Sequence, residues 1–162
     1  MVRRDLMRHY VSYCCAEAEG VSVSGELDQV MRTVVDTLDG ARGCGVVDVR
    51  TGDLLGVAHN VDYFNQTYLD AVAAAAVQMF RGATVTNVEE LISERRGVTP
   101  HHMIEEVQMT TSHTYHFMMI LPNHPEVALV LITDRKANVG FSWAALWGAS
   151  LEVEPLLEAE SH

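Results

Sequence analysis

The run from Val127 to Thr133 constrains the fold of this chain more than any other feature. Its sequence, Val-Ala-Leu-Val-Leu-Ile-Thr, is apolar almost throughout and shows no alternation of polar and apolar residues. Short runs of this kind are typical of strands that are buried on both faces. We therefore expect a central strand here, in a sheet that helices cover on both sides.

Four further segments carry strand patterns. Val and Leu residues flank the turn Arg50-Thr51-Gly52-Asp53, which predicts a hairpin, and a half-polar alternation and an aromatic-apolar segment precede the central strand. The expected strands are residues 44–49, 54–59, 104–111, 114–121 and 127–133. Because sequential strands with short connections usually pair, they predict one five-stranded antiparallel sheet flanked by helices, an α/β (α+β) architecture.

Helical periodicity and capping residues mark the remaining segments. The helices are expected at residues 3–18, 25–39, 66–80, 87–96 and 139–153. Ser24 is the expected N-cap of the second helix, and Pro155 is expected to end the last one. In helix 87–96 the pattern predicts that Val88, Leu91 and Ile92 point inward. These elements divide the chain into an N-terminal helical extension (1–22), one domain (23–157) and a polar tail (158–162).

Composition excludes several classes of protein. The formal net charge is −11, whereas a nucleic-acid binder needs clustered Lys and Arg to contact phosphates. No apolar run approaches the ~18 residues that a membrane span requires. The cysteines Cys14, Cys15 and Cys44 lack the spacing of a CxxC motif, which favours reduced thiols and hence a cytoplasmic protein.

Candidate catalytic and metal-binding residues do not form a recognisable constellation. His101 and His102 precede a strand, whereas His113 and His116 have an odd spacing that would place them on opposite faces of an extended segment. Cys44 lies among glycines and valines, as a small buried residue would. We therefore expect no metal, no cofactor and no enzymatic activity.

A resemblance to a known family rests on three stretches. They are Gly43 to Gly56, which reads glycine, short apolar strand, turn and return strand; the alanine-dense helix 66–80; and Val127–Asp134 followed by Ala137-Asn138-Val139-Gly140-Phe141. Together with the order of elements from Gly25 to Leu157, they resemble the roadblock/dynein light-chain family. The extra helix 3–18 and a longer segment at 83–102 depart from its simplest members.

The resemblance implies a roadblock/profilin-like fold and a homodimer, with sheets joined edge to edge and central helices side by side. It also implies a non-catalytic adaptor or scaffold that regulates a small GTPase. The half-polar strand 104–111 is a suitable sheet edge. The expected dimer-and-docking surface is on helix 66–80, at Tyr68, Val72, Ala75, Ala76 and Met79. The alternative hypothesis is a small-molecule or metal-sensing domain of similar α/β shape, with the histidine-bearing strands lining its pocket.

Overall fold

The computed structural model describes residues 22–160 and contains one five-stranded sheet. The strands are β1 (Ala41–Asp48), β2 (Leu54–His59), β3 (Glu106–Thr110), β4 (Thr114–Leu121) and β5 (His124–Asp134). Their order is β2-β1-β5-β4-β3, and every neighbouring pair is antiparallel. The predicted sheet is therefore confirmed, and its two edges are β2 and β3.

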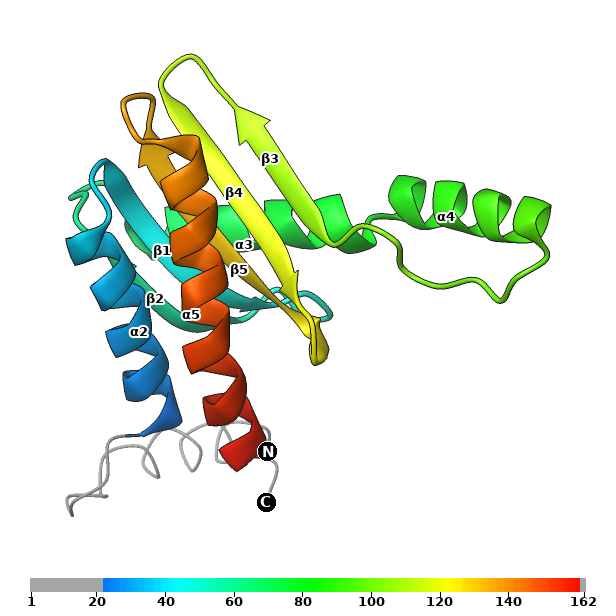
Figure 1. Cartoon of the computed structure of the whole chain (residues 1–162), viewed down its shortest axis with the longest axis horizontal. Coiled ribbons are helices and arrows are strands. Elements are labelled where there is room, and N and C mark those ends of the chain that lie inside the picture. The colour runs from blue at the N-terminus through cyan, green and yellow to red at the C-terminus, as the bar shows by residue number, and fades with distance from the viewer. Residues whose placement is uncertain (1–21, 161–162) are drawn as a thin grey trace, which may run out of the picture.

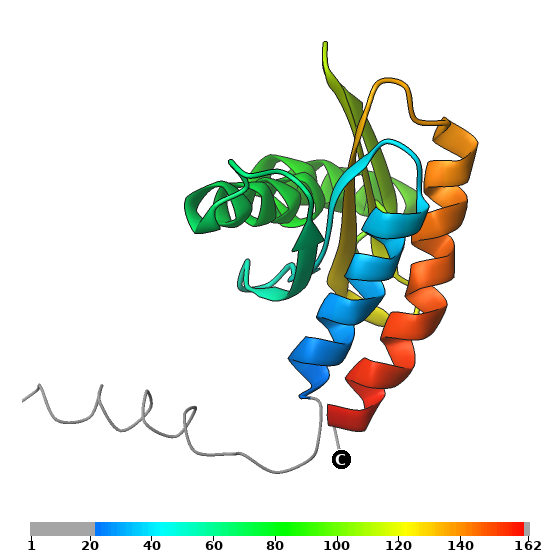
Figure 2. The same ribbon diagram turned by 90° about the vertical axis from the view of Figure 1, so that its left-hand side faces the viewer.

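Helices cover both faces of the sheet (Figures 1 and 2). The helices α2 (Val23–Thr37) and α5 (Val139–Glu160) lie side by side on one face, and α3 (Gln66–Arg81) crosses the opposite face. The helix α4 (Ala83–Arg96) follows α3 directly and projects beyond β3. Within residues 22–160, no helix combines the length and hydropathy needed to cross a membrane.

The central strand β5 is buried on both faces, as its apolar run predicts. Leu129 and Leu131 belong to the core beneath α2 and α5, and Ala128 and Val130 belong to the core beneath α3. All four side chains are at most 4% exposed. Because successive side chains of a strand point to opposite faces, one short segment supplies the centre of two hydrophobic cores.

The start of α2 differs from the expected one. Ser22, whose backbone is extended, accepts a hydrogen bond at its side chain from the backbone N–H of Gly25 at 3.2 Å. Ser24, the expected N-cap, lies inside the first turn, so the helix begins two residues early. The predicted helix 3–18 lies outside the described residues.

The end of α5 also differs, because Pro155 does not terminate the helix, which continues to Glu160. A proline removes one N–H from the helical ladder and crowds the preceding turn. Here Val153 and Leu157 are buried on either side of it, whereas Pro155 and Leu151 face solvent. Packing therefore maintains the helical path while water can reach the freed carbonyl. Residues 158–160, expected as a tail, are helical.

The orientation predicted for the fourth helix is wrong for the protomer. Val88, Leu91 and Ile92 are 49%, 58% and 37% exposed, and Glu89 and Ser93 are buried instead. The helix begins at Ala83, just after Gly82, and ends at Arg96, where Gly97 caps it with a positive φ of 66°. Its polar side faces the returning chain, and its apolar side faces outward.

Candidate protein-interaction surface

The β3 edge of the sheet is open. The N–H of Ile120 donates to the carbonyl of Glu105 at 2.8 Å, and that of Thr111 donates to Thr114 at 2.9 Å. In an antiparallel pair, alternate residues exchange these bonds, so the odd-numbered residues of β3 bond to β4. The backbone groups of Glu106, Gln108 and Thr110 then point away from the sheet. They form a row of donors and acceptors on which another strand can pair.

The β2 edge is closed by side chains of α2. The Asp28 carboxylate accepts a hydrogen bond from the Val57 N–H at 2.7 Å, and the Arg32 guanidinium donates to the His59 carbonyl at 3.0 Å. These two contacts occupy edge groups that a further strand would need. The sheet can therefore extend more readily at β3 than at β2. Sequence reasoning missed Asp28 and Arg32, because neither is part of a motif.

A glycine makes this closure feasible. A Cβ atom built on Gly56 would lie 2.6 Å from the Cβ of Leu27 and 3.1 Å from its backbone carbonyl carbon. Only a residue without a side chain lets α2 approach β2 so closely. The close approach brings Asp28, the next residue of the helix, within hydrogen-bond distance of β2.

The expected interaction residues of α3 divide between the core and the surface. Ala76 is 0% exposed and packs against the sheet with Ala73 and Phe80, so it cannot contribute to a surface of the protomer. Ala75 is exposed, and Val72 and Met79 are half-buried at the edges of the same core. The alanine face thus packs on the sheet, and the outer side of α3 remains accessible.

Tyr68 lies at the start of α3, in a group of aromatic side chains. Its ring stacks on Phe64 with centroids 4.4 Å apart and an interplanar angle of 17°, and Tyr63 contacts both rings edge-on. Tyr63 is 68% exposed. Large rings with exposed edges are well suited to interfaces. This group therefore extends the accessible side of α3 toward β2.

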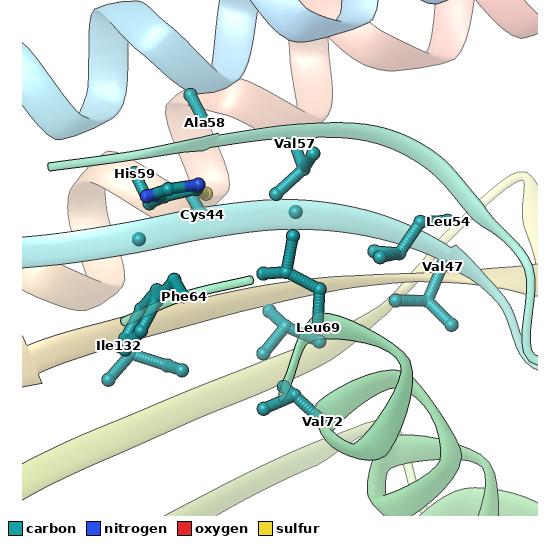
Figure 3. A pocket seen from close by; sticks show the side chains of 13 residues that line it. Cys44, Val47, Leu54, Val57, Ala58, His59, Phe64, Leu69, Val72 and Ile132 are labelled. Carbon is teal, nitrogen blue, oxygen red and sulfur yellow. The ribbon is translucent and has the colours of Figure 1, made fainter. Parts of the chain in front are cut away.

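A small cavity lies between α3 and the sheet (Figure 3). Its volume is about 30 Å³, and Leu69 and Val72 of α3 lie opposite β1 there. The hollow arises because Gly43 and Gly45 present no side chain, and the ring of Phe64 occupies the space above Gly43. A cavity of this size holds a water molecule at most. This cavity is therefore too small for an organic ligand, and it is separate from a hollow of about 530 Å³ that His101 and His102 help to line.

Cys44 is fully enclosed beneath the other face of the sheet. Burial raises the pKa of its thiol to about 12, so the group stays protonated at neutral pH. A thiol in this state is a poor nucleophile and a poor metal ligand. Its position agrees with the interpretation of Cys44 as a small core residue.

The described histidines are spread over several elements, although His101 and His102 are neighbours and line the same hollow. Across residues 22–160, no three His, Cys, Asp or Glu side chains come together in a group that could hold a metal ion. His113 is exposed in the β3–β4 turn, whereas His116 is half-buried on β4, where burial lowers its pKa. His102 donates from Nδ1 to the Glu89 carboxylate at 3.1 Å.

Glu89 ties α4 to the chain that returns to β3. Its carboxylate accepts hydrogen bonds from the N–H groups of Met103 at 2.7 Å and Ile104 at 3.3 Å, besides the contact with His102. Burial alone would raise its pKa, but these bonds to the carboxylate outweigh burial and hold the pKa below the ordinary value of 4.5. Glu89 is therefore an ionised anchor within the projecting segment.

Three arginines near α4, Arg81, Arg95 and Arg96, differ in what they contact. The guanidinium of Arg81 donates to the carbonyls of Phe80 at 2.9 Å and Pro125 at 2.7 Å, which ties the end of α3 to β5. Arg95 and Arg96 are exposed in the last turn of α4. A partner protein could meet the latter two without disturbing the fold.

The two tryptophans of α5 differ in their contacts and in their exposure to solvent. Trp143 donates from Nε1 to the Gln108 side chain at 3.1 Å and packs edge-on against Phe117. Trp147, one turn later, is 45% exposed. Trp143 thus contacts the open strand β3 from the α5 side of the sheet, whereas Trp147 remains on the surface.

The arrangement defines a small α+β domain with one open sheet edge and an accessible helix on one face. No protein-family model matches the sequence, and no curated protein matches it. Solved structures do match. A Roadblock/LC7 domain from Streptomyces avermitilis is 15% identical with a TM-score of 0.61, and covers 81% of this chain and 97% of its own.

Two structures of MglB match with higher TM-scores. MglB of Myxococcus xanthus has a TM-score of 0.65, and an MglB described with a tetrameric arrangement has 0.67; each is 17% identical and covers 88% of this chain and 94% of its own. The protein therefore has the roadblock/LC7 fold, as its sequence stretches indicate.

Proposed function

We propose that this protein is a non-catalytic homodimeric adaptor or regulator, and that its partner is a small GTPase. The single observation that carries the dimer is the asymmetry of the sheet edges: β3 presents free backbone groups, whereas Asp28 and Arg32 occupy groups of β2. When two copies of an exposed edge strand pair with each other, the free backbone donors and acceptors of that edge form hydrogen bonds without any additional element of structure. The self-associating MglB of the same fold supports this proposal.

The pairing has a defined geometry. Two copies of β3 related by a two-fold axis would pair antiparallel, with Gln108 opposite Gln108 of the second copy and Glu106 opposite Thr110. The outward backbone groups of these three residues would then bond across the axis. This pairing also brings the α3 helices of both copies to the same face of a continuous sheet. There Tyr68, Ala75 and their neighbours would line a joint surface.

Docking of a small GTPase on this α3 face rests on the likeness to roadblock proteins and on the accessible side chains described above. A regulator of this kind acts by binding one nucleotide state of the GTPase more tightly than the other, because only a difference in affinity shifts the equilibrium. The cytoplasm is the compartment in which we place this activity.

The dimer is tested by light scattering on a sizing column. We expect a mass of twice 17.9 kDa for the full chain. Thr110→Pro removes an outward N–H that β4 does not use, so we expect it to shift the mass toward the monomer while the fold is retained. Thr110→Val, which keeps the N–H, is the matched control. A monomeric wild-type chain at all concentrations would refute the dimer.

The partner is tested separately by isothermal titration. Small GTPases from the source organism, each loaded with GDP or with a non-hydrolysable GTP analogue, are titrated into the full chain. We expect one of them to bind with different affinities in its two nucleotide states, and Ala75→Glu to weaken that binding. Equal affinities in both states would exclude a regulatory role, and no binding at all would exclude this class of partner.

A further inference from the structure

The segment from α4 to the start of β3 forms an arm that stands away from the domain. Figure 1 shows α4 extending past the edge strand β3, and Figure 2 shows it on the same side of the sheet as α3. Glu89 fastens the returning chain to α4 through the N–H groups of Met103 and Ile104. Gly82 and Gly97 delimit the helix. The arm is therefore internally bonded while one of its faces lacks a partner within the described protomer.

That face is apolar. Val88, Leu91 and Ile92 have the i, i+3, i+4 spacing of one helical stripe, and Val85 continues it toward α3. Val88, Leu91 and Ile92 are all large and exposed. The pattern predicts burial, and the protomer does not provide it. An exposed stripe of this kind marks a surface that another molecule covers.

A matching surface lies on the sheet. On the α3 side, Val107 and Met109 of β3 and His116 of β4 are only half-buried. Met109 pairs with His116 and Val107 pairs with Met118, so these side chains share one face. This half-covered patch adjoins the open edge, next to the position that a second β3 would take.

We propose that the apolar stripe of α4 in each copy packs on the α3-side patch of β3 and β4 in the second copy. The inference rests on the proposed homodimer and adds to it a reciprocal exchange of arms. The helix has 14 residues, hence a length of about 21 Å, which spans roughly four strands at about 4.8 Å spacing. An arm that starts beside its own edge strand thus reaches across β3 and β4 of a paired copy.

Disulfide trapping tests the exchange in the full chain. The variant Leu91→Cys/Met109→Cys is made with Cys14 and Cys15 replaced by serine, and Cys44 is left in the core. Under mild oxidation we expect a covalent dimer on a non-reducing gel, with peptide mapping that joins positions 91 and 109. The matched control is Glu90→Cys/Met109→Cys, because position 90 lies on the opposite side of α4; we expect little covalent dimer from it.

The possible outcomes distinguish the proposed exchange of arms from the proposed dimer. A mass of two chains with no more 91–109 linkage than the control would overturn the arm exchange and leave the proposed dimer standing. A linkage confined within one chain would also overturn it, since the arm would then fold back on its own sheet. A monomeric wild-type chain would remove both proposals.

A second variant measures the contribution of the stripe to dimer affinity. Val88, Leu91 and Ile92 are exposed in the protomer, so their joint replacement by serine should leave the fold intact. We expect the dimer dissociation constant to rise roughly a hundredfold or more, because each copy loses three buried apolar side chains. An unchanged dissociation constant with unchanged helicity would refute the assignment.

Discussion

The contact between α2 and Gly56 predicts that Gly56→Ala destabilises the protein strongly. The added Cβ would lie 2.6 Å from the Leu27 Cβ, 3.1 Å from the Leu27 carbonyl carbon and 3.2 Å from the Asp28 nitrogen. Two of these atoms are backbone of a helix, which cannot move aside as a flexible side chain can. The helix must therefore shift away from β2 as a body.

The magnitude follows from the cost of overpacking. Inserting one methyl group into a closed contact costs about 1–3 kcal/mol, and the backbone contacts place this site at the upper end. For a chain of this size, each kcal/mol corresponds to roughly 2–4 °C in Tm. We therefore expect Tm to fall by roughly 4–12 °C. The shift of α2 would also lengthen the contact between Asp28 and the Val57 N–H.

The control is Gly45→Ala, on the neighbouring strand. There an added Cβ meets its nearest atoms at 3.4 Å, an ordinary van der Waals distance, and Gly45 does not have a positive φ. We expect a change within about 1 kcal/mol, because the methyl fits and the unfolded chain loses some freedom. Both variants are unfolded thermally at one protein concentration. Equal Tm values for the two variants would refute the reasoning.

Three further predictions follow from single contacts. Asp28→Ala should release the Val57 N–H, cost about 1–3 kcal/mol and produce species larger than the dimer on a sizing column, whereas Asp28→Asn, which keeps an acceptor, should do neither. Cys44 should resist iodoacetamide in the folded chain at neutral pH and react in urea, as read by peptide mapping; modification of the folded chain would contradict its burial. The pKa of Glu89 is lowered by folding, so its stabilising effect is present above its ordinary value of 4.5 and is lost as the pH falls through the folded-state pKa. The difference in Tm between wild type and Glu89→Gln should accordingly vanish in acid, and a difference independent of pH would show that ionisation of Glu89 is immaterial.

The elements that could be predicted from the sequence are those whose signal is local. The apolar run Val127–Thr133 specifies a strand buried on both faces, because no polar residue offers either face to water. The alanine-dense segment specifies α3 nearly to the residue. In both cases composition and periodicity favour the same type of secondary structure.

The features that could not be predicted depend on contacts between distant segments. Asp28 meets Val57 across 29 positions, and nothing near either residue indicates the bond. Pro155 was expected to end α5, but packing of Val153 and Leu157 overrides its local effect. The stripe on α4 was interpreted as a core face, since periodicity reports that a face becomes buried and not which chain covers it.

The face that carries α2 and α5 has a consequence for how the domain could be attached to other molecules. The start of α2 and the end of α5 lie close together in both views, on the side of the sheet opposite α3 (Figures 1 and 2). In a dimer built on β3, all four of these ends would leave from the same side. A fluorescent protein or a surface tether attached at the end of α5 would therefore leave the α3 side unobstructed, so that one side of the assembly carries the attachment and the other stays free for a partner.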